Sequence, residues 1–455
     1  MSPPSFELRL AAHVLSKRPD FCGAAERHTV RRALLDTIGC AVAGRQEPAA
    51  VIARTYARQA SPSGGAASLW SGGEKLPVEM AAWVNGIEAH VLDFDDVSSP
   101  MRGHPSVAML PALVAIAEAR DLSLGAVEEA YEAAYDALCR MSRAVAVAHY
   151  AHGWHTTATL GTLAGVMCCA RLIGLDETRF CHALGIALAQ LAGSRGNFGT
   201  MSKSLQAGQA GMIAVRSALL AEAGFDGAVD ALSGPQGFLH LYTQGGDFTR
   251  IFDEDATPAS ELTRSGLEVK KYPLCYATHR ALDAVLDLRA EYDMRLDAVA
   301  RIGVKCSHGA FVPLIHHRPQ TGLEAKFSIE YAMIAALQDG EVTLSSFEDA
   351  AVQRSIVQER LGDVVVIESA GAVMPRWAEV TLVLRDGRAL ARRADQLRGS
   401  AELPLSDDEL RRKAVDCFAH GGSERGPAIA STLLASADQP VRDIMAMLAM
   451  GPSSV

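Results

Sequence analysis

The chain has 455 residues, 49% of them hydrophobic and 21% charged, and its 43 Lys and Arg against 53 Asp and Glu leave a net charge of −10. Single hydrophobic cores stop growing near ~250–300 residues, so this length predicts more than one domain. The composition excludes disordered and low-complexity classes, and the acidic balance argues against the basic surface that nucleic-acid binding requires. A small anionic substrate stays compatible with it, because a local pocket can be positive on an acidic protein.

The cysteines and the apolar segments indicate in which cellular compartment the protein is expected. The nine cysteines include no Cys-x-x-Cys pair, so we expect reduced, buried thiols and neither a disulfide framework nor a zinc site. The first ten residues have no basic segment leading into an apolar run. The most apolar stretch, 161–170, is closed by Arg171 and is shorter than the ~20 residues that span a bilayer. We expect a cytoplasmic protein without membrane contact.

Helical periodicity dominates from the start of the chain to about residue 252. One apolar stripe recurs at helical spacing in Val30, Leu34, Leu35, Ile38 and Val42. Glycine-bounded gaps, as at 61–65 and 71–73, separate the segments. Further helices are predicted over 107–118, 126–147, 160–172 and 184–191, and the last two are apolar on all sides, as in the middle of a large core.

The pattern changes near Ser265. Alternating or β-branched runs predict strands over 299–307, 364–367 and 380–384, and Asp386-Gly387 predicts a hairpin turn that returns as 388–393. Helical patterns cover 281–292 and 327–338, and the last 60 residues return to helix with a Ser-x-x-Glu cap at Ser406. The predicted fold is mainly α: a large all-helical domain, 1–264 and 396–455, with a smaller α+β lid domain, 265–395, inserted into it.

Four polar clusters interrupt the apolar segments. In the first, a helix over 85–92 ends in the carboxylates of Asp93, Asp95 and Asp96, with Arg102 and His104 close behind. Acidic residues at a helix C-terminus oppose the helix dipole, so local structure alone would not select them. The structural alternative is a turn in which Asp96 and Ser106 cap local amides.

Histidines form the second cluster. His149, His152 and His155 precede an apolar helix, and imidazoles beside the free amides of a helix N-terminus suit a carboxylate. His149 and His152 could equally be surface residues.

The third cluster contains one lysine, Lys203, after Thr200 and before a Gly/Ala-rich helix. A cation there is costly unless paired, so Lys203 is expected to face a cleft that holds an anion. A phosphate-binding loop is excluded, because the glycine spacing is wrong and no strand precedes it.

The fourth cluster, 270–279, lies where the small domain begins and contains Tyr272, Cys275, Tyr276 and His279. Such residues at a domain junction suit a lid over a pocket. A nucleophilic role for Cys275 is the weaker alternative. Of the looser group His308, His316 and His317, we expect at most one to face the site.

Together these groups predict a site in which cations hold the carboxylates of a small polyacid and an imidazole or carboxylate removes a proton α to one of them. The rival is a metal site made of Asp93, Asp96, His104 and His155, although these residues lack a ligand spacing such as His-Glu-x-x-His.

At these residues the sequence resembles the MmgE/PrpD family, which includes 2-methylcitrate dehydratases, cis-aconitate decarboxylases and iminodisuccinate epimerases. The resemblance runs through nearly the whole chain, in segments 34–39, 85–96, 103–106, 155–161, 199–203 and 272–279. It implies a helical domain with an α+β lid, a homodimer, and an interdomain cleft that needs no metal or organic cofactor. The catalytic residues it implies are Asp93, His104, His155, Lys203 and His279.

Two departures bear on the reaction. Val97 stands where decarboxylase-like and many dehydratase-like members carry threonine, and His316 stands where decarboxylases place a tyrosine, which argues against direct decarboxylation. Segments 101–106, 197–201 and 275–279 look more like the iminodisuccinate epimerase branch.

The resulting hypothesis is a cofactor-independent lyase that acts on a di- or tricarboxylate by elimination, as 2-methylcitrate dehydratases do. Epimerisation is the alternative reaction, and a non-catalytic binding protein is the alternative class. His104 or His155 would be the base, Asp93 its orienter, Lys203 and Arg102 the carboxylate clamps, and His279 the lid acid. Substrate contacts are expected from Arg102, Asp96, Thr200, Tyr272 and His316.

Overall fold

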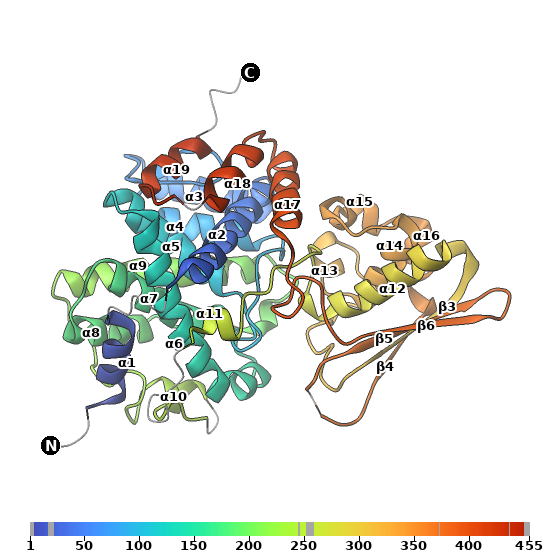
Figure 1. Ribbon diagram of the computed structural model, residues 1–455, viewed down its shortest axis with the longest axis horizontal. Helices are drawn as coiled ribbons and strands as arrows, with labels where there is room; N and C mark the ends of the chain where they lie inside the picture. The colour runs from blue at the N-terminus through green and yellow to red at the C-terminus, as the bar shows by residue number, and fades with distance from the viewer. Residues whose placement is uncertain are drawn as a thin grey trace.

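The computed structural model describes residues 4–16, 22–243, 246–251, 259–372, 374–435 and 437–449. Its helical body consists of α1 (Phe6–Leu15), α2 (Ala24–Gly44), α3 (Pro48–Ala60), α4 (Val78–His90), α5 (Pro105–Ala119), α6 (Leu124–Ala151), α7 (Leu160–Leu172), α8 (Glu177–Leu188), α9 (Ser202–Glu222), α10 (Phe238–Tyr242), α11 (Glu261–Arg264), α17 (Asp407–His420), α18 (Gly426–Leu434) and α19 (Val441–Leu448). Figure 1 shows α17, α18 and α19 packed on this body although they end the chain.

Caps and close packing explain the helices of this body. Ser123 accepts a hydrogen bond from the Ala126 amide at the start of α6, and Ser406 and Glu409 form the predicted capping box of α17. Helices α4 and α9 cross at Gly208, where a Cβ atom would lie 2.4 Å from the Trp83 carbonyl oxygen. This close approach brings the first turn of α9 to the last turn of α4.

One feature of the helical body departs from the all-helical prediction. The gap at 71–73 is the turn of a small antiparallel hairpin, in which β1 (Ala67–Ser68) pairs with β2 (Lys75–Leu76). Strands of two residues are shorter than any window in which alternation can be recognised.

The α+β part contains a four-stranded sheet in the order β4-β3-β5-β6. Strand β3 (Val299–Cys306) runs parallel to β4 (Val364–Glu368) and antiparallel to β5 (Ala378–Leu384), which forms the predicted hairpin with β6 (Ala389–Ala394). Helices α12 (His279–Tyr292) and α14 (Ile329–Asp339) lie over one side of the sheet (Figure 1), and the short α13 (Gly322–Ala325), α15 (Asp349–Val352) and α16 (Ser355–Gln358) complete the part.

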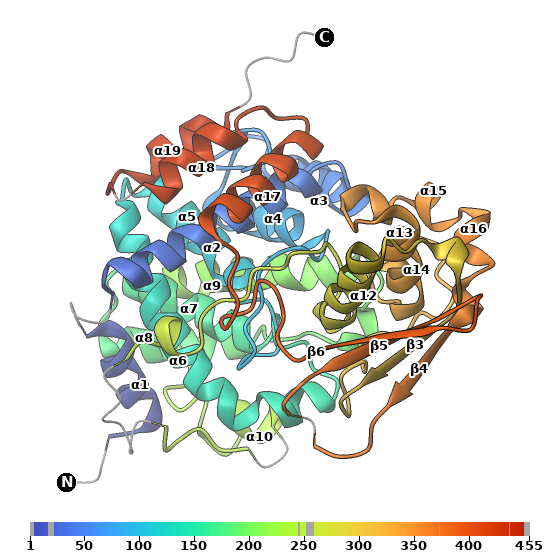
Figure 2. The same ribbon diagram turned by 45° about the vertical axis from the view of Figure 1, so that its right-hand side comes forward.

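Two large hydrophobic cores divide the chain, beside a small third cluster that includes Val91, Phe94 and Cys417. The first contains residues between Phe6 and Val269 and resumes at Leu405, whereas the second contains residues from Tyr272 to Ala394. The chain thus crosses between the cores twice, and Figures 1 and 2 show the sheet and its helices to one side of the helical body. The mainly α fold is confirmed, while the exact domain limits at 264/265 and 395/396 stay a prediction.

Two further expectations concern the cysteines and the membrane. All nine cysteines are buried, as predicted, and none is joined in a disulfide. Within the described part of the chain, every helix is too short or too polar to cross a bilayer.

Candidate active site

The candidate site is built around the loop that follows α4. Helix α4 ends at His90, and Asp93 adopts a left-handed backbone conformation with φ of 54°. This conformation is uncommon for a residue with a side chain and turns the chain sharply. The loop thereby directs the Asp93 carboxylate towards Lys203 in the first turn of α9 and the Asp95 carboxylate towards His90 and His104, with both acids buried.

Two lysine side chains and one imidazole converge on the Asp93 carboxylate. Its Oδ1 atom lies 2.8 Å from Lys203 Nζ, 3.1 Å from Lys270 Nζ and 3.5 Å from His104 Nε2. Burial alone would raise the pKa of Asp93, but Lys203 and Lys270 hold this pKa well below its usual range. Asp93 is therefore an anion whose charge is shared between two ammonium groups.

Asp95 holds two imidazole rings. His90 Nδ1 donates to its carboxylate at 2.9 Å, and His104 Nδ1 lies 3.1 Å from Oδ2. Burial lowers the pKa of His90 to about 4, so this ring is neutral at pH 7. Because the proton is on Nδ1, Nε2 accepts a hydrogen bond from Lys203 Nζ at 2.7 Å. Hydrogen bonds thus connect Lys203 through the His90 ring to Asp95.

His155 is a neutral imidazole with a free nitrogen. The side-chain nitrogen of Gln206 donates to Ser194 O, which turns the Gln206 oxygen towards His155 Nδ1 at 2.6 Å. Nδ1 must therefore carry the proton, and Nε2 makes no hydrogen bond to another described residue. Burial and then Lys203 lower the pKa of His155 well below its usual value. The ring stacks on His90 at 6.1 Å between centroids and meets the edge of Phe198 at 5.1 Å. Nε2 therefore carries a lone pair that can accept a proton.

The α+β part closes over this cluster. A cavity of about 20 Å³ beside Asp93 and Lys203 is bounded on the other side by Lys326 and Phe327. This volume holds about one water molecule. A di- or tricarboxylate is larger, so its entry requires the two parts to separate at this point.

Asp96 lies apart from the other acids. Its Oδ1 accepts from the Ser106 amide at 3.3 Å, and its Oδ2 accepts from the Ser106 hydroxyl, which also contacts the Tyr131 hydroxyl at 2.7 Å. Burial raises the pKa of Asp96 well above its usual value. The structure thus has the capping arrangement that was the alternative for this residue, and no hydrogen bond or ion pair among the described residues joins the Asp96 side chain to Asp93 or Asp95.

His279 and Tyr272 lie at the junction, yet they face one another. The ring of His279 meets Tyr272 and Tyr276 edge-on at 5.2 and 5.0 Å, and its Nε2 lies 3.3 Å from Leu274 O. The Tyr272 hydroxyl donates to Asp283 at 2.8 Å. Burial lowers the pKa of His279 well below its usual value, so this residue is neutral here. Their roles as lid acid and substrate contact stay predictions.

The other predicted contacts lie near the site entrance. Thr200 lines the small cavity, although its hydroxyl donates to Asn197 O at 2.8 Å. The buried Nε2 of His316 has no hydrogen-bond partner among the described residues and lies above Gly199, where a Cβ would come within 2.6 Å of it. Gly199 also has φ of 85°, which favours glycine.

Arg102 is half-buried and makes no ion pair with a described carboxylate. Burial lowers its pKa, and the nearby Arg195 lowers it further. A guanidinium in such surroundings is available to bind an anion.

Sequence reasoning missed several members of the cluster. His90 and Lys270 lie inside the first and fourth polar clusters, but no role was predicted for either. Gln206 follows Lys203 in a helix, and nothing in the sequence around it indicates a function. Lys326, between Ala325 and Phe327, was not noticed, although the argument applied to Lys203, a lysine in an apolar stretch, would have found it.

A metal could be considered at a different set of residues from the predicted one. Ligand atoms of His90, Asp93, Asp95 and His104 lie within 4.8 Å of one another, whereas Asp96 and His155 are outside the group. Lys203 Nζ contacts both Asp93 Oδ1 and His90 Nε2. A cation held by these atoms would therefore have to displace the Lys203 ammonium, so the donor set fits a metal poorly.

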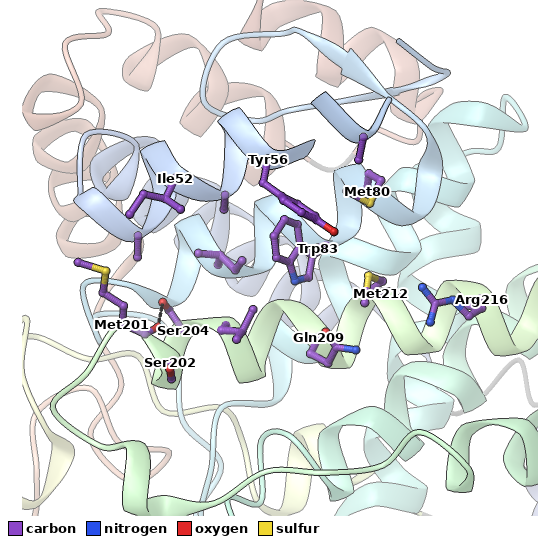
Figure 3. A pocket seen from close by; sticks show the side chains of 15 residues that line it. Ile52, Tyr56, Met80, Trp83, Met201, Ser202, Ser204, Gln209, Met212 and Arg216 are labelled. Atoms are coloured by element: carbon purple, nitrogen blue, oxygen red, sulfur yellow. Dashed lines mark hydrogen bonds between the residues drawn. The ribbon is translucent and has the colours of Figure 1, made fainter. Parts of the chain in front are cut away.

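A larger hollow lies between α3, α4 and α9 (Figure 3). It has a volume of about 570 Å³ and is lined mainly by apolar side chains, including Ile52, Tyr56, Trp83 and Met212. The guanidinium at its end, Arg216, already pairs with Glu79 and Gln190. This hollow, called the apolar groove below, offers no free cation for a carboxylate among the residues that line it.

Comparisons with known proteins identify the family of this chain. The MmgE/PrpD N-terminal domain matches residues 8–251 and the MmgE/PrpD C-terminal domain matches residues 272–434. The chain is similar to the cis-aconitate decarboxylase of Homo sapiens, with 28% identity over 84% of this chain and 81% of the relative. It is also similar to the enzymes of that name from Mus musculus (27%, over 84% and 80%) and Aspergillus terreus (25%, over 70% and 68%). The chain therefore belongs to the MmgE/PrpD family.

Proposed function

We propose that this protein is a cofactor-independent lyase that removes a proton α to a carboxylate of a small di- or tricarboxylate and expels a leaving group from the neighbouring carbon. The observation that carries the proposal is the unprotonated Nε2 of His155, whose ring stacks on His90, the residue that accepts a hydrogen bond from Lys203 of the Lys203–Asp93 pair. The related decarboxylases, whose name gives a tricarboxylate substrate, support this substrate class.

The charges of the site suit an anionic substrate. Lys203 and Lys270 supply two ammonium groups next to Asp93. Arg102, which makes no ion pair with a described carboxylate, is proposed as a further contact for the substrate. Electrostatic stabilisation of a carboxylate that gains negative charge is worth several kcal/mol in a dry site, at roughly 10²–10³ in rate per donor. These cations would hold the carboxylate whose α carbon loses its proton.

His155 is the better candidate for the base. Its Nδ1 is occupied by the neutral Gln206 amide, which leaves Nε2 free to accept a proton. Both ring nitrogens of His104 instead lie near carboxylates, Nδ1 at 3.1 Å from Asp95 and Nε2 at 3.5 Å from Asp93, although Nδ1 makes no hydrogen bond to a described residue. A ring between two carboxylates suits donation, so His104 would protonate the departing group while the electron pair of the broken C–H bond forms the alkene.

Epimerisation of an iminodisuccinate-like dicarboxylate is the second candidate. His104 and His155 both lie against His90, with ring centroids 4.5 and 6.1 Å from it, so two imidazoles border one site. If they address opposite faces of the α carbon, one removes the proton and the other returns a proton to the other face.

The test is incubation of the protein in deuterated water with a panel of hydroxylated, unsaturated and nitrogen-bearing di- and tricarboxylates, followed by NMR and ultraviolet absorbance. Elimination predicts an absorbing alkene, and epimerisation predicts deuterium at the α carbon with inversion. Release of CO₂ would indicate decarboxylation and overturn both. A panel without exchange or product would favour the non-catalytic binding protein.

A further inference from the structure

Three buried lysines bind three consecutive carbonyl groups of the loop that carries Asp93. Lys326 Nζ donates to Leu92 O at 2.6 Å, Lys270 Nζ to Asp93 O at 2.7 Å, and Lys413 Nζ to Phe94 O at 2.8 Å. We call Lys270, Lys326 and Lys413 the carbonyl clamp. Their exposed fractions are 1%, 3% and 9%, so water contributes little to their solvation.

The members of the clamp come from separate parts of the chain. Lys270 lies in the first crossing between the cores, Lys326 follows α13 in the α+β part, and Lys413 lies in α17 of the returning helical body. Lys326 also donates to Pro273 O at 2.8 Å, so its ammonium joins a carbonyl of the helical body to one of the α+β part. One ammonium group thus links the loop after α4 to the α+β part.

The backbone explains why cations are needed there. The C-terminal carbonyls of a helix lack partners and carry the negative end of the helix dipole, and α4 ends only two residues before Leu92. The left-handed turn at Asp93 prevents the next residues from satisfying these carbonyls by continuing the helix. An ammonium group in an apolar site is itself costly unless it is paired, so three of them indicate a requirement beyond packing.

Lys326 differs from the other two in its charge balance. Lys413 forms an ion pair with Asp36 at 2.6 Å, and Lys270 contacts Asp93 Oδ1 at 3.1 Å. Lys326 has no carboxylate within 4.0 Å among the described residues, and its Nζ lies 4.7 Å from the centroid of the Phe347 ring. In keeping with this, burial lowers the pKa of Lys326 to about 7.

We propose that Lys326 and Lys413 are positioning residues, which hold the backbone of 92–94 so that the Asp93 carboxylate meets Lys203, and that Lys326 couples this alignment to closure of the α+β part. The proposal rests on the proposed function for its catalytic consequence, but the holding of the loop can be measured without any substrate. Lys270 is excluded from the positioning role because it contacts Asp93 directly.

The experiment compares the full chain with Lys326→Met and with the control Lys271→Met, which removes an exposed lysine next to the clamp. Amide hydrogen exchange of 91–97, measured by mass spectrometry without ligand, should become faster in Lys326→Met only. On whichever panel substrate the wild type converts, kcat should fall by about 10²-fold, the scale of a ~1 Å misplacement, while KM changes little. A purely structural role would lower the melting temperature without this division between kcat and KM.

A second variant keeps the proposal falsifiable if Lys326→Met does not fold. Lys413→Met with Asp36→Asn removes the third donor and neutralises its buried partner, and it should give the same two results. Unchanged exchange at 91–97, or unchanged kcat, in whichever variant folds would overturn the proposal. If the wild type converts no carboxylate, the proposed function fails, and the exchange result still decides whether the clamp holds the loop.

Discussion

Two hollows meet at the first turn of α9, and their chemistry is opposite. Met201 and Ser204 line both of them. On one side Lys203 joins Asp93 and His90 in a closed cavity of about 20 Å³, and on the other the apolar groove has about 570 Å³. The residues that line the larger hollow lack the groups that proton transfer needs, so the convergence of charged side chains, and not volume, is the reason to place the proposed chemistry on the other side of this helix.

The largest expected effect comes from removing one cation from each side of α9 and comparing the loss of kcat/KM. Lys203→Met should lower kcat/KM by about 10²–10⁴-fold, because it removes both a carboxylate clamp and the partner of Asp93. Arg216→Met, on the same helix but in the groove, should leave kcat/KM unchanged. Steady-state kinetics on a panel substrate measures both. Equal losses in the two variants would remove the distinction between the hollows.

The structure shows why much of the fold could be predicted from sequence. Helices such as α6 and α12, the strand β3 and the β5–β6 hairpin follow from local periodicity and turn residues, which act within a few residues of chain. The β1–β2 hairpin was not predicted, because its strands have two residues each and show no recognisable alternation. Local patterns of sufficient length were therefore reliable, and shorter ones were not.

The site was predictable only in part, for a physical reason. Asp93, His104 and Lys203 were recognised as polar residues in unfavourable local surroundings, and they do converge. Asp96 was in the same surroundings, but its burial is compensated locally by Ser106. Lys326 reaches Leu92 from 234 positions away, and no local pattern encodes such a contact. The sequence therefore indicates which residues need partners, whereas the tertiary fold decides which partners they find.

A smaller expected effect is the pH dependence of the free energy of unfolding, to which the buried histidines of the polar side contribute. Burial lowers the pKa of His90 to about 4 and that of His155 well below its usual value, so the unfolded chain binds more protons than the folded chain between these values and about 6.5. Their contribution to stability is therefore complete above about pH 6.5 and is lost as the pH falls, by at most about 1.4 kcal/mol per pH unit for each histidine.

Urea unfolding between pH 7.5 and 4.5 measures this slope. His155→Gln should reduce it, because one of the two groups is gone. His317, whose side chain is 74% exposed, provides the matched control in His317→Asn, for which an unchanged slope is expected because solvent screens an exposed ring. An equal slope in wild type and His155→Gln would show that His155 is not held neutral in the folded protein.

The central claim is that the free Nε2 of His155 removes a proton from a carboxylate substrate held by Lys203. The most direct measurement is exchange of the α hydrogen for deuterium in deuterated water, followed by NMR for the wild type and His155→Gln at equal saturation with a panel substrate. The account predicts rapid exchange in the wild type and, in the variant, unchanged binding with exchange slowed by about 10²–10⁴-fold. Exchange at the wild-type rate in His155→Gln would contradict it.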